Sequence, residues 1–314
     1  MKTYLLRRIL SIIPVMLIVA TLVFTIQRMT PGNPAEIILG EEALPEDVKE
    51  LEHRMGLDRP LYVQLGIWYL NLARGDFGTS IYYDKPVTEV VLAHALPTLQ
   101  LTLMAMMVDI LLGITIGVAA AAKHGTKTDN LLMLVASVNL SLPISWLGLV
   151  LMLAFSLQLK IFPVSGYVPF LENPLQSVAY MILPAVAIGA GASARLARMT
   201  RASLLEILRS DYILAARAKG VGRNSILFKH ALKNSLIPIL TVIGLSLAAN
   251  MGGAVISEQI FGIPGMGRLM IFAVFNRDYP VVQGIVLFIA FIYVFINLVI
   301  DIVYAMVDPR IAYD

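Results

Sequence analysis

Six long apolar blocks dominate this sequence of 314 residues, and they decide the solvent in which the chain folds. Crossing the hydrocarbon core of a bilayer takes about 20 apolar residues of helix. Hydrophobic residues form 58% of the chain and charged residues 14%. Soluble domains have about 25% charged residues. The sequence therefore predicts an all-α polytopic membrane protein with six transmembrane helices. The first predicted span begins after Arg8 and ends at about Met29. The other five are Leu96–Ala122, Leu131–Leu157, Val178–Leu196, Leu236–Ser257 and Val281–Val307.

Basic and acidic residues separate between the two sides of the predicted membrane. Lys2, Arg7 and Arg8 precede the first span, and further Lys and Arg residues lie in the loops at residues 123–127 and 199–235. Acidic residues instead gather in residues 30–95. Because cytoplasmic loops are enriched in Lys and Arg, this pattern predicts that both termini lie in the cytoplasm.

The long acidic loop over residues 30–95 is expected to form a helical cap outside the membrane. Apolar residues recur there at helical spacing in Pro45–Met55 and Leu61–Ala73. Neither an internal repeat nor a low-complexity linker divides the sequence. We therefore expect one transmembrane domain over residues 1–314, embedded in the lipid membrane.

Motifs for enzymatic chemistry are missing. The sequence has no cysteine, and the dipeptide Gly-Lys of a phosphate-binding Walker A loop does not occur. Its four histidines lack metal-ligand spacing. The modest net charge of +3 gives no reason to expect nucleic-acid binding. We predict no catalytic, cofactor-binding or metal-binding residues, and hence a protein that is not an enzyme.

The loop from Asp211 to Pro238 predicts two short helices joined by a turn. Helix-forming residues fill Asp211–Lys219, Gly220 and Gly222 interrupt them, and Asn224 or Ser225 is expected to cap a second helix. Such a hairpin has a shape that docks into a groove on a separate motor protein. The alternative is a basic, solvated hairpin that satisfies the positive-inside rule and attracts anionic lipid headgroups.

This hairpin resembles the EAA loop of ABC-importer permeases, in the branch that carries dipeptides, oligopeptides and nickel complexes. The resemblance rests first on Ala215 to Gly220 and on Lys229 to Asn234. Leu214 and Lys233 replace the Glu and Pro of the general pattern, as is usual in the peptide branch. Further matching motifs are Arg7-Arg8, Thr30 to Pro34, Met55 to Leu61, Gly75 to Ser80, Leu96 to Thr98, Glu258, Phe261, Pro264 to Arg268, Arg277 to Pro280 and Asp308 to Arg310.

The resemblance implies the fold of type I ABC-importer permeases and a place in the bacterial inner membrane. It implies a homologous second permease subunit, two ABC ATPase subunits that bind ATP and Mg, and an extracytoplasmic solute-binding protein. It also makes residues 199–235 a cytoplasmic coupling loop. The implied ATPase-coupling residues are Asp211, Ala215, Ala216, Arg217, Lys219, Gly220, His230 and Asn234.

The expected cargo is a dipeptide, an oligopeptide or a similarly small solute. Glutathione, nickel complexes and some sugars remain open, because permeases of this branch carry them on nearly the same framework. Specificity is expected to lie in the binding protein.

Polar residues inside the apolar blocks are candidates for a translocation path, because charges at membrane depth are rare unless they have a function. The candidates are Asp109, Asn139, Ser246, Asn250, Gly253 and Glu258. The alternative is that they hydrogen-bond or pack between helices. An ion-coupled secondary transporter remains a rival, with Asp109, Glu258 and Asp301 as titrating groups. An intramembrane enzyme would need paired catalytic groups that the sequence does not show.

Glycine and proline predict close helix packing and one tight turn. Gly113 and Gly117 have the spacing that lets two membrane helices approach closely. The stretch from Phe261 to Arg268 contains Pro264 and three glycines, which predicts a structured loop between the last two spans. This loop is expected either to contact the binding protein or to serve as a simple turn.

Overall fold

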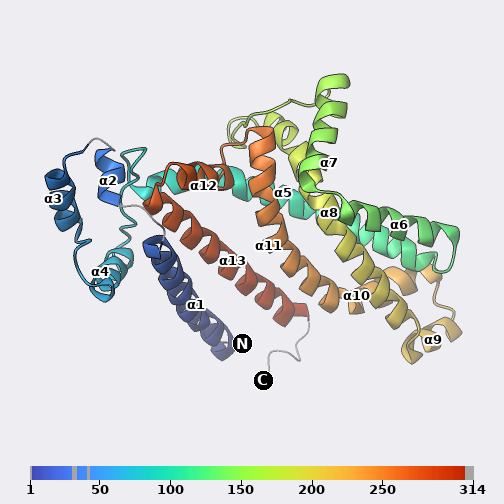
Figure 1. The fold of residues 1–314 in the computed structure, drawn as a ribbon. Helices are drawn as coiled ribbons and strands as arrows, with labels where there is room; N and C mark the ends of the chain where they lie inside the picture. The colour runs from blue at the N-terminus through green and yellow to red at the C-terminus, as the bar shows by residue number, and fades with distance from the viewer. Residues whose placement is uncertain (1, 30–33, 41–42, 308–314) are drawn as a thin grey trace. The chain divides into compact units, whose positions relative to one another are not determined.

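The computed structural model describes residues 2–29, 34–40 and 43–307. Within these ranges the chain is helical apart from loops and one isolated bridge between Thr79 and Pro86, so the predicted all-α class is confirmed (Figure 1). The motif residues Thr30 to Asn33 and Asp308 to Arg310 lie outside the described residues, as do the side chains of Arg7, Arg8 and Asp301.

The chain forms two compact units, and each is described by itself. The first unit comprises Met1–Leu5, Leu96–Arg268 and Phe295–Asp314. The second unit comprises Leu6–Ala95 and Leu269–Val294.

Five helices in the described residues contain stretches long and apolar enough to cross a membrane. They are α1 (Lys2–Met29), α5 (Val87–Ala122), α8 (Pro174–Leu208), α11 (Leu236–Phe261) and α13 (Tyr279–Val307). Each covers a block predicted from the sequence. Helix α8 has 35 residues and continues well beyond the predicted end at Leu196, into the segment expected to be a loop.

The third predicted span, Leu131–Leu157, is not one continuous helix. It is divided between α6 (Lys127–Ser141) and α7 (Ile144–Leu151), and α7 continues as a π-helical turn, η1 (Met152–Gln158). The two parts are bent by 104°. Pro143 explains the break, because a proline disfavours helical conformation in the preceding residue, and Leu142 is extended with ψ 130°. If the bent pair counts as one span, the described residues contain six.

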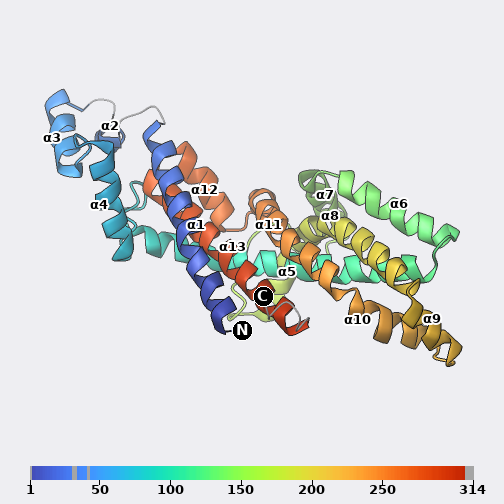
Figure 2. The same ribbon diagram turned by 90° about the horizontal axis from the view of Figure 1, so that it is seen from below.

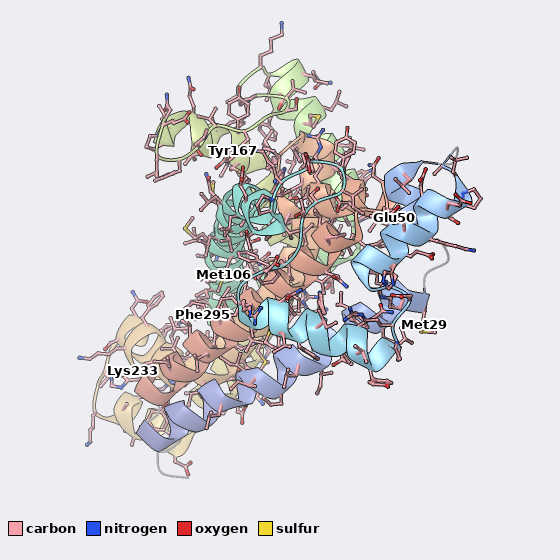
Figure 3. All side chains as sticks on the ribbon, turned by 90° about the vertical axis from the view of Figure 1, so that its left-hand side faces the viewer. Met29, Glu50, Met106, Tyr167, Lys233 and Phe295 are labelled. Atoms are coloured by element: carbon pink, nitrogen blue, oxygen red, sulfur yellow. The ribbon has the colours of Figure 1, made fainter. Side chains whose placement is uncertain are left out.

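The first unit is built around α8, which packs against α6, α7 and α11 (Figures 1 and 2). Gly113 and Gly117 allow α5 to approach α8 closely, as predicted. A Cβ atom at Gly117 would lie 2.5 Å from the Cβ of Thr200, and one at Gly113 would lie 2.7 Å from Leu196. On the loop before α8, the Tyr167 hydroxyl donates to Oε1 of Gln100 over 3.4 Å (Figure 3).

The second unit contains the helices expected for the cap. Helix α3 (Pro45–Met55) and helix α4 (Leu61–Ala73) have the predicted bounds, and α2 (Pro34–Leu39) precedes them. Helix α3 is rich in charges, whereas α4 has none. Helix α4 packs against α1, where the Tyr69 hydroxyl lies 2.7 Å from Oγ1 of Thr21.

Helix α12 (Met266–Phe275) begins in the first unit and continues into the second. In the second unit, the buried carboxylate of Asp278 anchors the segment before α5. Ser80 donates its hydroxyl to Oδ2 of Asp278 over 2.5 Å, and the backbone N–H of Tyr82 donates to the same oxygen over 3.2 Å.

Candidate functional site

The first helix of the predicted hairpin is α9 (Asp211–Ala218). It ends as the sequence predicts, because Gly220 adopts a left-handed conformation with φ +79°. The N–H of Gly220 donates to the carbonyl of Arg217 over 2.9 Å, and the N–H of Val221 donates to that of Ala216 over 3.2 Å. These bonds satisfy two carbonyls of the last turn, so the chain reverses without leaving them unpaired.

The second helix is wider than an α-helix over most of its length. It consists of a π-helical stretch, η2 (Ser225–Ala231), followed by α10 (Leu232–Asn234). The predicted side-chain cap is wrong: Asn224 is already helical, with φ −66° and ψ −39°, and makes no capping bond. The helical hydrogen bonding begins earlier, where the N–H of Ile226 donates to the carbonyl of Gly222 over 3.0 Å.

A side-chain bridge joins the two helices of the hairpin. The Asn234 amide donates to the Tyr212 hydroxyl over 2.8 Å and to the His230 carbonyl over 3.0 Å. Two of these three residues were candidates from the sequence, but His230 takes part through its backbone. Tyr212 was missed, because its partner lies 22 residues away and no local pattern reveals the pairing.

One face of the hairpin is buried against the ends of α5 and α8. Ile213 and Ala231 are fully buried, and Leu227 packs with Ala231, Val118 and Leu204 in one apolar cluster. Because the residues of this cluster come from η2, α5 and α8, packed side chains attach the hairpin to the ends of two spans. The hairpin and the ends of those spans are therefore packed together in one apolar cluster.

The hairpin also exposes large apolar side chains. The exposed fraction is 45% for Tyr212, 51% for Leu214 and 57% for Phe228. Among the other predicted coupling residues, Ala216 is half-buried and Asp211, Ala215, Arg217, Lys219 and Gly220 are exposed. Phe228 was missed by sequence reasoning, although an aromatic residue in a loop predicted to face water was the available signal. Lys233, labelled in Figure 3, lies in α10 at the end of the hairpin.

A buried ion pair fixes the start of α6 to α8. Nε and Nη2 of Arg201 donate to the two carboxylate oxygens of Asp129, each over 2.7 Å. Asp129 is 1% exposed, and it also accepts from the N–H of Gly125 over 3.1 Å. His124 Nδ1 lies 3.2 Å from the same carboxylate. This pair lies beside the apolar cluster that holds the hairpin, because Ala121 and Leu204 of that cluster are three residues from His124 and Arg201 in sequence.

The structure brings three of the six path candidates together. Asp109 on α5 faces Ser246 and Asn250 on α11, and all three side chains are buried. Their side-chain oxygens, together with the Asn250 amide nitrogen, make no hydrogen bond within the described residues. Such atoms at membrane depth usually bind water, an ion or another polar group.

Glu258, a fourth candidate, lies in the last turn of α11, and its side chain reaches the start of α12. Its carboxylate accepts from the Thr98 hydroxyl over 2.5 Å and from the N–H of Arg268 over 2.9 Å. The N–H of Met266 in turn donates to Thr98 Oγ1 over 2.8 Å. Glu258 therefore caps the N-terminus of α12 with its negative charge, which the helix dipole favours.

The last two candidates are Gly253, one turn from Asn250 on α11, and Asn139 on α6. Gly253 is buried where α11 approaches α7 and α8, since a Cβ atom there would lie 3.0 Å from Ile144 and from Ile188. Asn139 is half-buried near the end of α6, where its carbonyl accepts from the N–H of Leu142 over 3.4 Å. In the part of the chain that the structure describes, no group of three or more His, Cys, Asp or Glu side chains is arranged to hold a metal ion.

Comparison with protein families decides what kind of protein carries this hairpin. Residues 113–313 match the family model described as "Binding-protein-dependent transport system inner membrane component". Residues 1–86 match the model for the N-terminal part of such membrane components. The chain belongs to this family. It is therefore a multi-pass inner-membrane permease of a transport system, and the resemblance stated from its motifs is confirmed.

Curated members of the family match this permease along its whole length. It is 41% identical to the dipeptide transport system permease protein DppB of Alkalihalophilus pseudofirmus, with 100% of both chains covered. It is 43% identical to a putative peptide transport system permease protein of Brucella abortus, again over 100% of both. It is 40% identical to the glutathione transport system permease protein GsiC of Salmonella paratyphi A, also over 100% of both.

A solved structure shows the same fold at low sequence identity. The permease resembles a chain from an inward-facing structure of the MetNI methionine ABC transporter with a TM-score of 0.59 and 18% identity. The likeness covers 70% of this chain and 96% of the other. The predicted ABC-importer permease fold is confirmed.

Proposed function

We propose that this chain is the membrane-spanning permease subunit of an ATP-driven importer for dipeptides, oligopeptides or similarly small solutes. Full-length relatives named for dipeptides and peptides support this cargo. Glutathione is a close alternative, because a relative named for it is almost as similar. A nickel complex remains a weaker alternative within the same branch.

The proposed assembly contains a homologous second permease, two ABC ATPases and an extracytoplasmic solute-binding protein. ATP and Mg bind to the ATPases, and this chain carries no cofactor of its own. The positive-inside pattern supports cytoplasmic termini. The same orientation puts the hairpin over Asp211–Asn234 on the cytoplasmic side, where the ATPases are, and residues 30–95 outside.

The observation that carries the proposal is that the hairpin combines buried apolar residues, which attach it to the spans, with exposed apolar residues. Leu227 and Ala231 attach it to α5 and α8 by packing with Val118 and Leu204. Leu214 and Phe228, the large aliphatic and aromatic side chains of its exposed surface, have exposed fractions of 51% and 57%. Exposed apolar residues on a small element often mark a protein interface. We assign this face to an ATPase groove, with Ala215, Ala216 and Gly220 permitting close approach.

Asp211, Arg217 and Lys219 surround the apolar face and are assigned to polar contacts at its rim. His230 and Asn234 hold the hairpin together from within. Closure of the ATPases around ATP would move the hairpin as one body and reorient the attached spans, giving alternating access.

We propose that the cargo passes beside α5 and α11, where Asp109, Ser246 and Asn250 face one another. In this conformation all three side chains are buried. Separation of the spans during transport would expose them to the path. Membership of a binding-protein-dependent family argues against an ion-coupled secondary transporter, which would need no ATPase.

The decisive experiment is co-purification of the permease with its ATPases, comparing the native chain with an Ala216→Glu, Gly220→Pro double variant. Proline cannot adopt the positive φ of Gly220, and a carboxylate at position 216 opposes close docking. We expect normal membrane levels but loss of the ATPases and of solute uptake. Retention of both the complex and uptake would contradict the coupling role.

A further inference from the structure

A cavity lies between the hairpin and the ends of the two spans that carry it, within the first unit. Its volume is about 690 Å³. It is formed by the last residues of α5, the end of α8, the C-terminal part of α9 and the beginning of η2. The lining residues are Ala121, Ala122, His124, Leu205, Leu208, Arg209, Arg217, Val221, Arg223, Ile226 and Leu227.

The charges around this cavity are all positive or potentially positive. Arg209, Arg217, Arg223 and His124 line it, and no Asp or Glu does. Within the described residues, Arg209 and Arg217 form no side-chain hydrogen bond or ion pair. Arg223 donates to the carbonyl of Ala122, the last residue of α5. Two guanidinium groups beside the cavity are therefore available to an anion.

The rest of the lining is apolar. Leu205, Leu208 and Leu227 belong to the cluster that attaches the hairpin to the spans, and Ile226 is buried beside them. A soluble anion such as phosphate gains nothing from this surface. An amphiphile, with an anionic head and apolar tails, matches both parts of the lining.

The position along α5 corresponds to the edge of the membrane. Between Asp109 and Lys123 this helix has no charged residue, and Ala121 and Ala122 are its last two residues. The apolar part of the span thus ends at the cavity, where lipid headgroups begin. Basic pockets between membrane helices on the cytoplasmic side are known to bind anionic headgroups.

We propose that this cavity binds the phosphate-bearing headgroup of an anionic phospholipid, with Arg209 as its principal ligand and Arg217, at the rim assigned to the ATPase, as a second ligand that the two partners share. Bidentate contacts from guanidinium groups suit the phosphate oxygens. The cytoplasmic assignment of the site rests on the proposed function. A lipid held there touches the hairpin, α5 and α8 together, so membrane composition would adjust the transmission of movement from the ATPases.

The test compares Arg209→Gln with Arg198→Gln in the complete transporter. Both residues are exposed; Arg198 lies on α8 and does not line the cavity, whereas Arg209 directly follows the last residue of α8 and does. The complexes are reconstituted in vesicles of phosphatidylglycerol and phosphatidylcholine, extracted, and examined by native mass spectrometry. We expect Arg209→Gln to lower retained phosphatidylglycerol about fivefold, equivalent to about 1 kcal/mol for one basic residue. Arg198→Gln should retain the native amount, and Arg209→Lys should fall between Arg209→Gln and the native chain, because it keeps the charge but loses the bidentate contact.

Other occupants give different results. If the variants retain equal phosphatidylglycerol, the lipid site is refuted. If inorganic phosphate displaces the bound lipid at low concentration from the native complex, the site takes free phosphate and the lipid assignment is wrong. A third outcome combines two measurements: Arg209→Gln retains the native amount of phosphatidylglycerol from the mixed vesicles, but loses the ATPases in pure phosphatidylcholine vesicles. In that case an acidic residue of the ATPase, and not a lipid, occupies the cavity.

Failure of this inference is separable from failure of the proposed function. Lipid retention is measured without ATP or solute, so it does not depend on uptake. A native complex that binds phosphatidylglycerol but carries no peptide would leave the lipid site intact and contradict the cargo. A native complex that transports peptide but retains no phosphatidylglycerol would support the proposed function and refute the lipid site.

Discussion

Thr98 and Glu258 are 160 residues apart in sequence, yet the hydroxyl of the first donates to the carboxylate of the second over 2.5 Å. Both side chains are buried. The same Thr98 oxygen accepts the N–H of Met266, and Glu258 accepts the N–H of Arg268. Two spans and the start of α12 are thus joined by one continuous hydrogen-bonded group.

Replacement of this carboxylate should destabilise the first unit. Glu258→Ala leaves the Thr98 hydroxyl and the Arg268 N–H without their acceptor, and each unsatisfied buried group costs about 1–3 kcal/mol. We expect a lower unfolding temperature for the purified protein in detergent. The matched control is Gln259→Ala, because Gln259 is the next residue on α11 and is exposed.

The same measurement separates a structural role from a role in the path. A Glu258→Ala protein with native unfolding temperature but altered solute preference would show that the carboxylate contacts cargo. A protein with lowered stability and unchanged solute preference would agree with the capping role.

The glycine beside this carboxylate provides a second prediction. A Cβ atom at Gly265 would lie 2.2 Å from Cδ of Glu258, whereas one at Gly252 would have no neighbour within 4 Å. Gly265→Ala should therefore destabilise by about 1–3 kcal/mol through overpacking. Gly252→Ala should be neutral or stabilising by about 0.5–1 kcal/mol, because alanine favours the helix. Thermal unfolding of both variants checks the difference, and equal shifts would contradict it.

Local patterns predicted the features that depend on nearby residues. The bounds of α3 and α4 followed from helical spacing, and the end of α9 followed from Gly220. The break in the third span was missed although Pro143 was visible, because length and hydropathy alone favoured one continuous helix. The length of α8, which has 35 residues, was underestimated because the arginines in its last part suggested a loop. One of them, Arg201, is instead paired with Asp129 on α6.

Contacts between distant segments could not be predicted in this way. The sequence suggested that Asp109 and Glu258 are both functional, but it did not show that the first faces Ser246 and the second caps α12. The cavity beside Arg209 likewise depends on three chain segments meeting. Such groupings arise from tertiary packing and leave no periodic signal.

The buried ion pair of Asp129 and Arg201 gives a third prediction. Arg201→Gln leaves a carboxylate that is 1% exposed without its partner. Arg201 is partly exposed and the Gly125 N–H still donates to Asp129, so we expect a loss of about 1–3 kcal/mol and a lowered unfolding temperature. Asp129→Asn combined with Arg201→Gln should recover much of the loss. Lys127→Gln, an exposed charge two residues from Asp129, is the control. If the single and double variants are equally unstable, the pair is not the cause.

The link between Tyr212 and Asn234 should decide how efficiently ATP hydrolysis is converted into transport. Tyr212→Phe removes the hydroxyl that accepts the Asn234 amide over 2.8 Å, but it keeps the ring and therefore the exposed apolar face. We expect the ATPases to remain bound and ATP hydrolysis to continue, while uptake per ATP falls because the hairpin's two helices move less rigidly. The loss of one such hydrogen bond costs about 0.5–1.5 kcal/mol.

Uptake and hydrolysis are measured together in proteoliposomes. Asn234→Ala should lower the same ratio, and the double variant should add little to either single change. The control is Tyr62→Phe, whose side chain is 77% exposed on α4. A native ratio in Tyr212→Phe, or additive losses in the double variant, would show that the bridge does not transmit the movement.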